Sequence, residues 1–103
     1  MQTLLLLTPE EVWPITKKLT EAPSEQRLQR LLGGPVARVP DFDTLEYDGE
    51  VYACVAFCSR GKRKRRPRVN PYATMLWNHA RRRNGCNRNS GCLAGPVAVI
   101  FRT

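Results

Sequence analysis

The chain has 103 residues, of which 42% are hydrophobic and 25% are charged, and this length suits one domain with a single core. Seventeen Lys and Arg residues outnumber nine Asp and Glu residues, so the formal net charge is +8. No stretch approaches the ~18 continuous apolar residues of a membrane helix, and no basic region precedes the leucines near the start. We therefore expect no signal peptide and no membrane contact, but a cytoplasmic protein whose cysteines are free thiols.

The charges are divided between the two halves of the chain. Residues 1–50 hold all nine acidic residues and five basic ones, a net charge of −4, whereas residues 51–103 hold twelve basic residues and no acidic one. The second half cannot neutralise its own field. It must either fold against the acidic half or attract an outside polyanion.

Four segments of the first half predict strands or turns. The apolar run at residues 3–7 predicts a buried strand, and residues 11–15 predict a partner strand that Pro14 confines to a sheet edge. Residues 36–39 predict a short strand. Residues 41–50 are rich in acids and have Asp48-Gly49 at the tip, which is typical of an exposed turn.

A short helix is predicted between these strands, over residues 25–32. Ser24 is a typical N-cap residue, and leucines follow at helical spacing. Gly33 and Gly34 then favour the left-handed backbone that ends many helices.

The second half predicts two strands around a second helix. Residues 51–58 alternate between two apolar faces, which indicates a central strand covered on both sides. Asn70 and Pro71 are a favourable N-cap and first helical residue, so we expect a helix over residues 71–83. Residues 96–101 predict a final strand.

Together these elements predict one α+β domain over residues 1–103, in which two helices pack on a small mixed sheet of about four to five strands. Two loops interrupt the pattern: a basic loop at residues 59–70, and a loop rich in Cys, Asn and Gly at residues 84–92.

The order of three motifs, "LQRLLGGPVARV", "VNPYATMLW" and "AGPVAVI", resembles the small domain of unknown function numbered 3846, which is common in phages, plasmids and other mobile elements. The resemblance covers about residues 28–103 and implies an accessory protein of a mobile element. The chain departs from the family pattern in its basic loop and in the cysteine-containing loop. The most specific matches are Gly33, Gly34, Asn70, Ala73 and Gly95.

Two clusters of cations are the strongest chemical signal of the sequence. Closely spaced Lys and Arg side chains displace the counterions condensed on nucleic acid, and Arg adds bidentate phosphate contacts. We therefore expect a non-enzymatic protein that binds nucleic acid or an acidic host protein, the latter as an inhibitor of host defence of the anti-CRISPR or anti-restriction kind. The other reading of such a run is a solvated loop. The candidate binding residues are Arg60, Lys62, Arg63, Lys64, Arg65, Arg66, Arg68, Arg81, Arg82, Arg83 and Arg88.

The four cysteines offer a competing hypothesis, a zinc-stabilised module or a small enzyme. Their spacings, C-x3-C and C-x5-C, differ from the tighter knuckles of zinc modules. His79 is the only histidine, and no motif ties a nucleophile or carboxylate to it. We therefore expect no catalytic residue, no metal site and no cofactor. The cysteines are Cys54, Cys58, Cys86 and Cys92.

Overall fold

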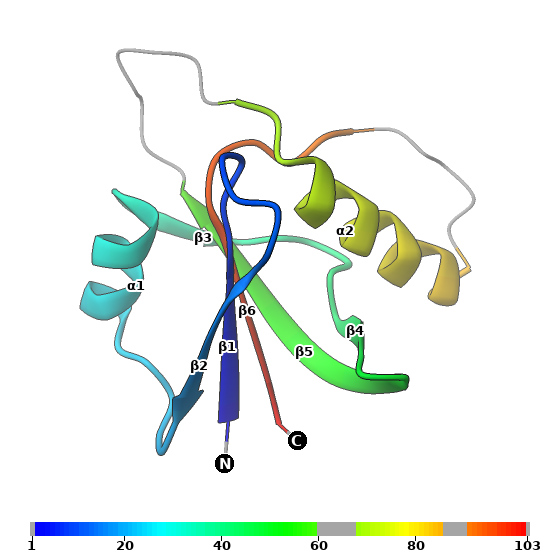
Figure 1. The fold of residues 1–103 in the computed structure, drawn as a ribbon, viewed down its shortest axis with the longest axis horizontal. Coiled ribbons are helices and arrows are strands. Elements are labelled where there is room, and N and C mark those ends of the chain that lie inside the picture. Colours follow the sequence, from blue (N-terminus) through cyan, green and yellow to red (C-terminus); the bar gives the residue numbers. More distant parts are fainter. Residues whose placement is uncertain (1, 60–67, 86–90, 103) are drawn as a thin grey trace.

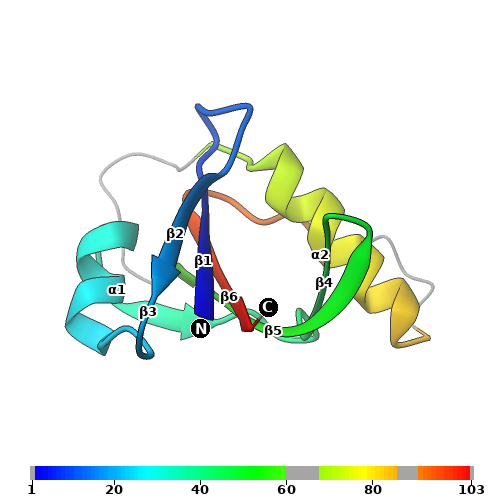
Figure 2. The same cartoon turned by 60° about the horizontal axis from the view of Figure 1, so that its bottom comes forward.

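The computed structural model describes residues 2–59, 68–85 and 91–102. A six-stranded sheet forms the middle layer, and one helix lies on each of its two sides (Figures 1 and 2). In chain order the elements are β1 (Gln2–Leu7), β2 (Ile15–Leu19), α1 (Glu25–Leu32), β3 (Val36–Arg38), β4 (Thr44–Tyr47), β5 (Glu50–Ser59), α2 (Pro71–Arg83) and β6 (Val97–Arg102).

The α+β class is confirmed, with two corrections to the predicted sheet. It has six strands rather than four to five, because the acidic segment contributes a strand of its own. Every pairing between the named strands is antiparallel, so the sheet is not mixed. The strand order is β2-β1-β6-β5-β3, with β4 paired to β5 as well.

The sheet has an apolar core on each face. Successive side chains of a strand point to opposite faces, so Leu4 of β1 packs with Leu28 and Leu32 of α1, while its neighbour Leu5 packs with the cluster that includes Leu76 of α2. In β6 the five residues from Val97 to Phe101 are all buried. The predicted central position of the strand at residues 51–58 is confirmed, since β5 pairs with β6 on one side and with β3 and β4 on the other.

The edge formed by β3 and β4 is interrupted by a bulge at residues 40–42. The ladder with β5 runs to Val39, whose N–H donates to the Ala56 carbonyl, and resumes at Asp43, whose carbonyl accepts from the Cys54 N–H. The extra residues turn the Phe42 side chain into the core, where it is 1% exposed. Asp41, at the centre of the bulge, has a φ of 62°.

The prediction of an exposed acidic turn at residues 41–50 is therefore wrong for most of that segment. Phe42 and Leu45 are each only 1% exposed, and Thr44–Tyr47 form β4. The acidic residues alternate with these apolar residues, as in a strand with one buried face. The high acidic content of the segment led us to predict a turn instead. The tip between β4 and β5, Asp48-Gly49, is a turn as predicted, with φ values of 52° and 82°.

The strand expected at residues 11–15 is shifted along the chain. β2 begins at Ile15, directly after Pro14, and pairs with β1 at one edge of the sheet. Pro14 has no N–H to donate to a ladder, so the strand begins after it. The edge position itself was predicted correctly.

Both predicted helices are confirmed with their bounds. The Ser24 hydroxyl accepts a hydrogen bond from the Arg27 N–H at 3.2 Å, and Gly33 ends α1 with a φ of 79°. Its N–H donates to the Gln29 carbonyl at 2.8 Å. No helix within the described residues is long and apolar enough to cross a membrane.

Asn70 joins α2 to the sheet. Its side-chain oxygen accepts from the Ala73 N–H at 3.2 Å, which caps the helix. Its side-chain nitrogen donates to the Leu7 carbonyl at 3.0 Å and to the Gly95 carbonyl at 2.9 Å. At 1% exposed, this one carboxamide connects the helix to the end of β1 and to the segment that leads into β6.

We predict that Asn70→Ala lowers the free energy of unfolding by about 3 kcal/mol, because it removes a cap and leaves two buried carbonyls without their donor. Ser24→Ala, which removes only a cap, should cost about 1 kcal/mol. Denaturant unfolding at neutral pH measures both. Equal losses in the two variants would mean that the two donated hydrogen bonds contribute nothing.

Candidate functional site

The structure describes four of the eleven candidate cations. Arg68 lies just before the cap of α2, and Arg81, Arg82 and Arg83 form the last turn of the helix. A helix of this length spans about 20 Å, so Arg68 and the other three arginines occupy opposite ends of it. The remaining candidates lie outside the described residues: Arg60, Lys62, Arg63, Lys64, Arg65, Arg66 and Arg88.

The three arginines at the end of α2 have different surroundings. The guanidinium carbon of Arg81 lies 4.6 Å from the centre of the Trp77 ring, a cation–π contact. Arg83 donates from Nε to the Thr44 hydroxyl at 2.8 Å, so it reaches across to β4. Arg82 is exposed to solvent and lines a hollow along α2.

Trp77 is held in place by the bulge. Its indole N–H donates to the Pro40 carbonyl at 2.8 Å, and its ring packs against the apolar cluster beneath α2. One residue beyond the end of the helix, the Asn84 amide donates to the Asp43 carboxylate at 2.8 Å. These contacts, together with that of Arg83, attach the C-terminal end of α2 to β4 and to the residues just before it.

A hollow of about 380 Å³ lies along the exposed side of α2. Asn78, His79 and Arg82 line it together with residues of the first helical turns. We call these three residues the polar face of α2. The three residues lie on one side of the helix, opposite the buried Ala73, Leu76 and Ala80. Helical periodicity could have grouped them, but no motif in the sequence marked Asn78 as part of a site.

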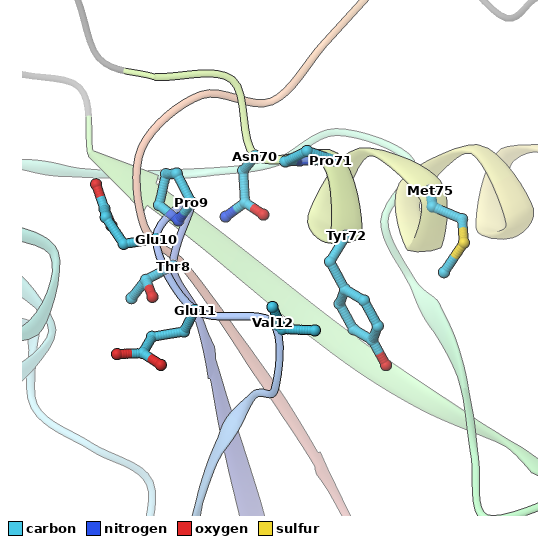
Figure 3. Close-up of a pocket in the computed structure, with 9 residues that line it drawn as sticks. All are labelled: Thr8, Pro9, Glu10, Glu11, Val12, Asn70, Pro71, Tyr72 and Met75. Atoms are coloured by element: carbon cyan, nitrogen blue, oxygen red, sulfur yellow. The ribbon is translucent and has the colours of Figure 1, made fainter.

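A second hollow, also of about 380 Å³, lies between residues 8–12 and the first turns of α2 (Figure 3). We call it the loop hollow. Val12 and Tyr72 face each other across it, and Met75 lies further along the helix. Its two sides are 60 residues apart in the sequence, so no local pattern pointed to it. Its lining residues are Thr8, Pro9, Glu10, Glu11, Val12, Asn70, Pro71, Tyr72 and Met75.

The cysteines are poorly suited to nucleophilic or metal chemistry. Cys54 and Cys58 lie half-buried on the face of β5 that α2 covers. Burial raises the pKa of the Cys54 thiol to about 12, and nearby Asp43 adds to the rise. Burial likewise raises the pKa of Cys58. Both thiols therefore stay protonated at neutral pH, whereas a nucleophile or metal ligand must be a thiolate.

Of the other two cysteines, Cys92 is exposed and Cys86 lies outside the described residues. Within the described parts of the chain, no three His, Cys, Asp or Glu side chains gather as a metal site would require. His79 lines the hollow on α2, beside Asn78 and Arg82.

Comparison with family models, with curated proteins and with solved structures gave no match to this chain. The resemblance to the phage and plasmid domain of unknown function stays a prediction from the motifs. The functional argument therefore depends on the geometry described above.

We predict that iodoacetamide at pH 8 labels Cys92 at least ~10-fold faster than Cys54 in the folded protein, because labelling requires an accessible thiolate. Raising the pH to 9.5 should leave Cys54 almost unlabelled, since its pKa is about 12. Mass spectrometry of the digested protein measures each site separately. In denaturant both thiols should react at similar rates. Fast labelling of Cys54 in the folded state would contradict the protonated, protected thiol.

Proposed function

We propose that this chain is a non-enzymatic nucleic-acid-binding domain, an accessory protein of a phage or another mobile element. Its nucleic-acid surface runs along the exposed side of α2. Arg68 and Arg82 contact phosphates at the two ends of the helix, and the polar face between them lies against the nucleic acid.

The observation that carries this proposal is the composition of the hollow along α2. Asn78, His79 and Arg82 line it, and among the residues that the structure describes no acidic side chain does. Amide, imidazole and guanidinium groups are the donors and acceptors that proteins use on phosphates and base edges. An exposed helix is also an element that fits the major groove of a duplex.

The charge of the surrounding chain supports the same surface. No acidic residue follows Glu50 in the sequence, so β6 and all of α2 contribute only positive charge. Arg82 therefore lies in a part of the sequence whose charges favour an approaching polyanion.

We predict that Arg68→Gln/Arg82→Gln weakens binding to a 20-base-pair duplex and flattens the plot of log affinity against log salt by about 1.8, because each lost phosphate contact removes about 0.9 from the slope. Fluorescence anisotropy over a series of salt concentrations measures this slope. On a single strand the change should be about 1.4. Because phosphates carry no sequence information, duplexes of different sequence should all weaken alike.

The matched control is Arg27→Gln/Arg30→Gln, which removes the same charge from exposed positions on α1, across the sheet from α2. It should leave the slope nearly unchanged. If both pairs flatten the slope equally, binding follows net charge and the α2 surface is not the site. If neither free duplex nor single strand binds, while an acidic host protein is captured in a salt-dependent way, the ligand is that protein.

The basic loop is tested separately, by replacing the five residues of its central run with Gln. If about five loop and flanking cations contact phosphate, the unmodified chain has a slope near −4.5 on duplex, and this variant should lose most of it. An unchanged slope would mean that the run is a solvated loop. The substituted residues are Lys62, Arg63, Lys64, Arg65 and Arg66.

A further inference from the structure

The loop hollow differs in chemistry from the surface proposed for nucleic acid. Glu10 and Glu11 are the charged residues among its lining side chains, and the rest are apolar or neutral. Both carboxylates extend from the loop on its side away from Tyr72 (Figure 3), and we call these two groups the acidic rim. An acidic rim repels phosphate, so this hollow calls for a different ligand.

The side chains around the hollow are unusually exposed for their size. Val12 is 78% exposed, Tyr72 38% and Met75 44%, and Trp13 beside the hollow is 80% exposed. Six of the seven large hydrophobic side chains that are exposed in the described chain belong to residues 12–15 or 69–75, the two segments that border it. Single exposed apolar residues are ordinary, but a concentration of them marks an interaction site. Aromatic residues and methionine are typical of protein interfaces.

The hollow also contains a polar group without a partner. The Thr8 hydroxyl oxygen is buried and makes no hydrogen bond to any described residue. Thr8 itself begins the turn of the loop, where its carbonyl accepts from the Glu11 N–H at 3.3 Å. This hydroxyl belongs to a residue that lines the hollow, but its oxygen is shielded from solvent.

We infer that the loop hollow is a docking site for a short basic segment of another protein. One apolar side chain of the segment enters between Val12 and Tyr72, and flanking Lys or Arg side chains pair with Glu10 and Glu11. At physiological salt, charges more than about 8 Å away are largely screened. The two carboxylates at the rim therefore make the hollow prefer a basic segment to an acidic one, although the net charge of the whole chain is +8.

Charge also distinguishes this partner from a second copy of the chain. In a two-fold dimer through the hollow, the acidic rim of each copy would lie near the acidic rim of the other, and the like charges would repel each other at short range. A basic segment avoids this repulsion. Its apolar anchor provides the contact area that a charged pair alone does not.

The test uses three fluorescein-labelled peptides of twelve residues at 0.15 M salt. The first alternates Lys and Ser around two central leucines, the second has Glu in place of Lys, and the third has Ser in place of the leucines. By anisotropy, the first should bind at least ~10-fold more tightly than either of the others, because charge and apolar contact are both needed. In a methyl NMR spectrum it should shift the Met75 signal.

Two variants separate the contribution of charge to peptide binding from that of apolar contact. Glu10→Lys/Glu11→Lys should reverse the preference, so that the acidic peptide with leucines binds more tightly than the basic one. Tyr72→Ser/Met75→Ser should weaken the first peptide at least ~10-fold. All four positions are exposed, and circular dichroism will verify that each variant is folded.

The control for charge is Glu21→Lys/Glu46→Lys, which makes the same change at exposed positions outside the hollow and should keep the original preference. Equal binding of the basic and acidic peptides, or binding that leaves the Met75 signal unshifted, would overturn the inference. So would dimerisation in sedimentation that Tyr72→Ser/Met75→Ser abolishes. The nucleic-acid proposal is measured on Arg68 and Arg82, which do not line the loop hollow, so the two tests can fail separately.

Discussion

The carboxamide of Asn70 holds the fold together at the point where its most distant parts meet. It caps α2, and it donates to the carbonyls of Leu7 and Gly95, which lie 63 and 25 residues away. A buried carbonyl without a donor is costly, and a helix end without a cap is weak. Asn supplies one acceptor and two donors at a single point, whereas an ionised Asp would supply acceptors only. The first turn of α2 is therefore held against the ends of two strands.

The position of α2 in turn creates both candidate surfaces. Its buried side covers the apolar face of the sheet, and its exposed side has two chemically distinct parts. Near the cap, Tyr72 and Met75 approach the acidic loop between β1 and β2. Towards the other end, Asn78, His79 and Arg82 form a polar face without acids. One helix thus borders both an apolar hollow with an acidic rim and a polar face that includes Arg82, and the two proposed ligands would meet different charged residues on it.

The bulge at residues 40–42 fixes the other end of the helix. It places the Pro40 carbonyl where the Trp77 indole can donate to it, and it turns Phe42 inward beneath α2. Arg83 and Asn84 then bond to the residues that follow the bulge. The same packing buries Cys54 and keeps its thiol protonated, since a thiolate there would lose its hydration. The cysteines on β5 thus pack against the core, and the side chains of both candidate surfaces come largely from α2.

The sequence by itself determined the elements whose causes are local. The bounds of both helices follow from Ser24, Gly33 and Asn70 acting on neighbouring backbone groups, and the central strand follows from alternation within residues 51–58. The tertiary structure alone decided the bulge, the two hydrogen bonds that Asn70 donates, and the meeting of Val12 with Tyr72. Each of these features joins groups that are far apart in the chain. Whether such a contact forms depends on how close the fold brings the two groups, which no local sequence pattern encodes. The acidic strand was missed for the same reason: Leu45 is buried because β4 pairs with β5 under α2, while its acidic neighbours remain in water.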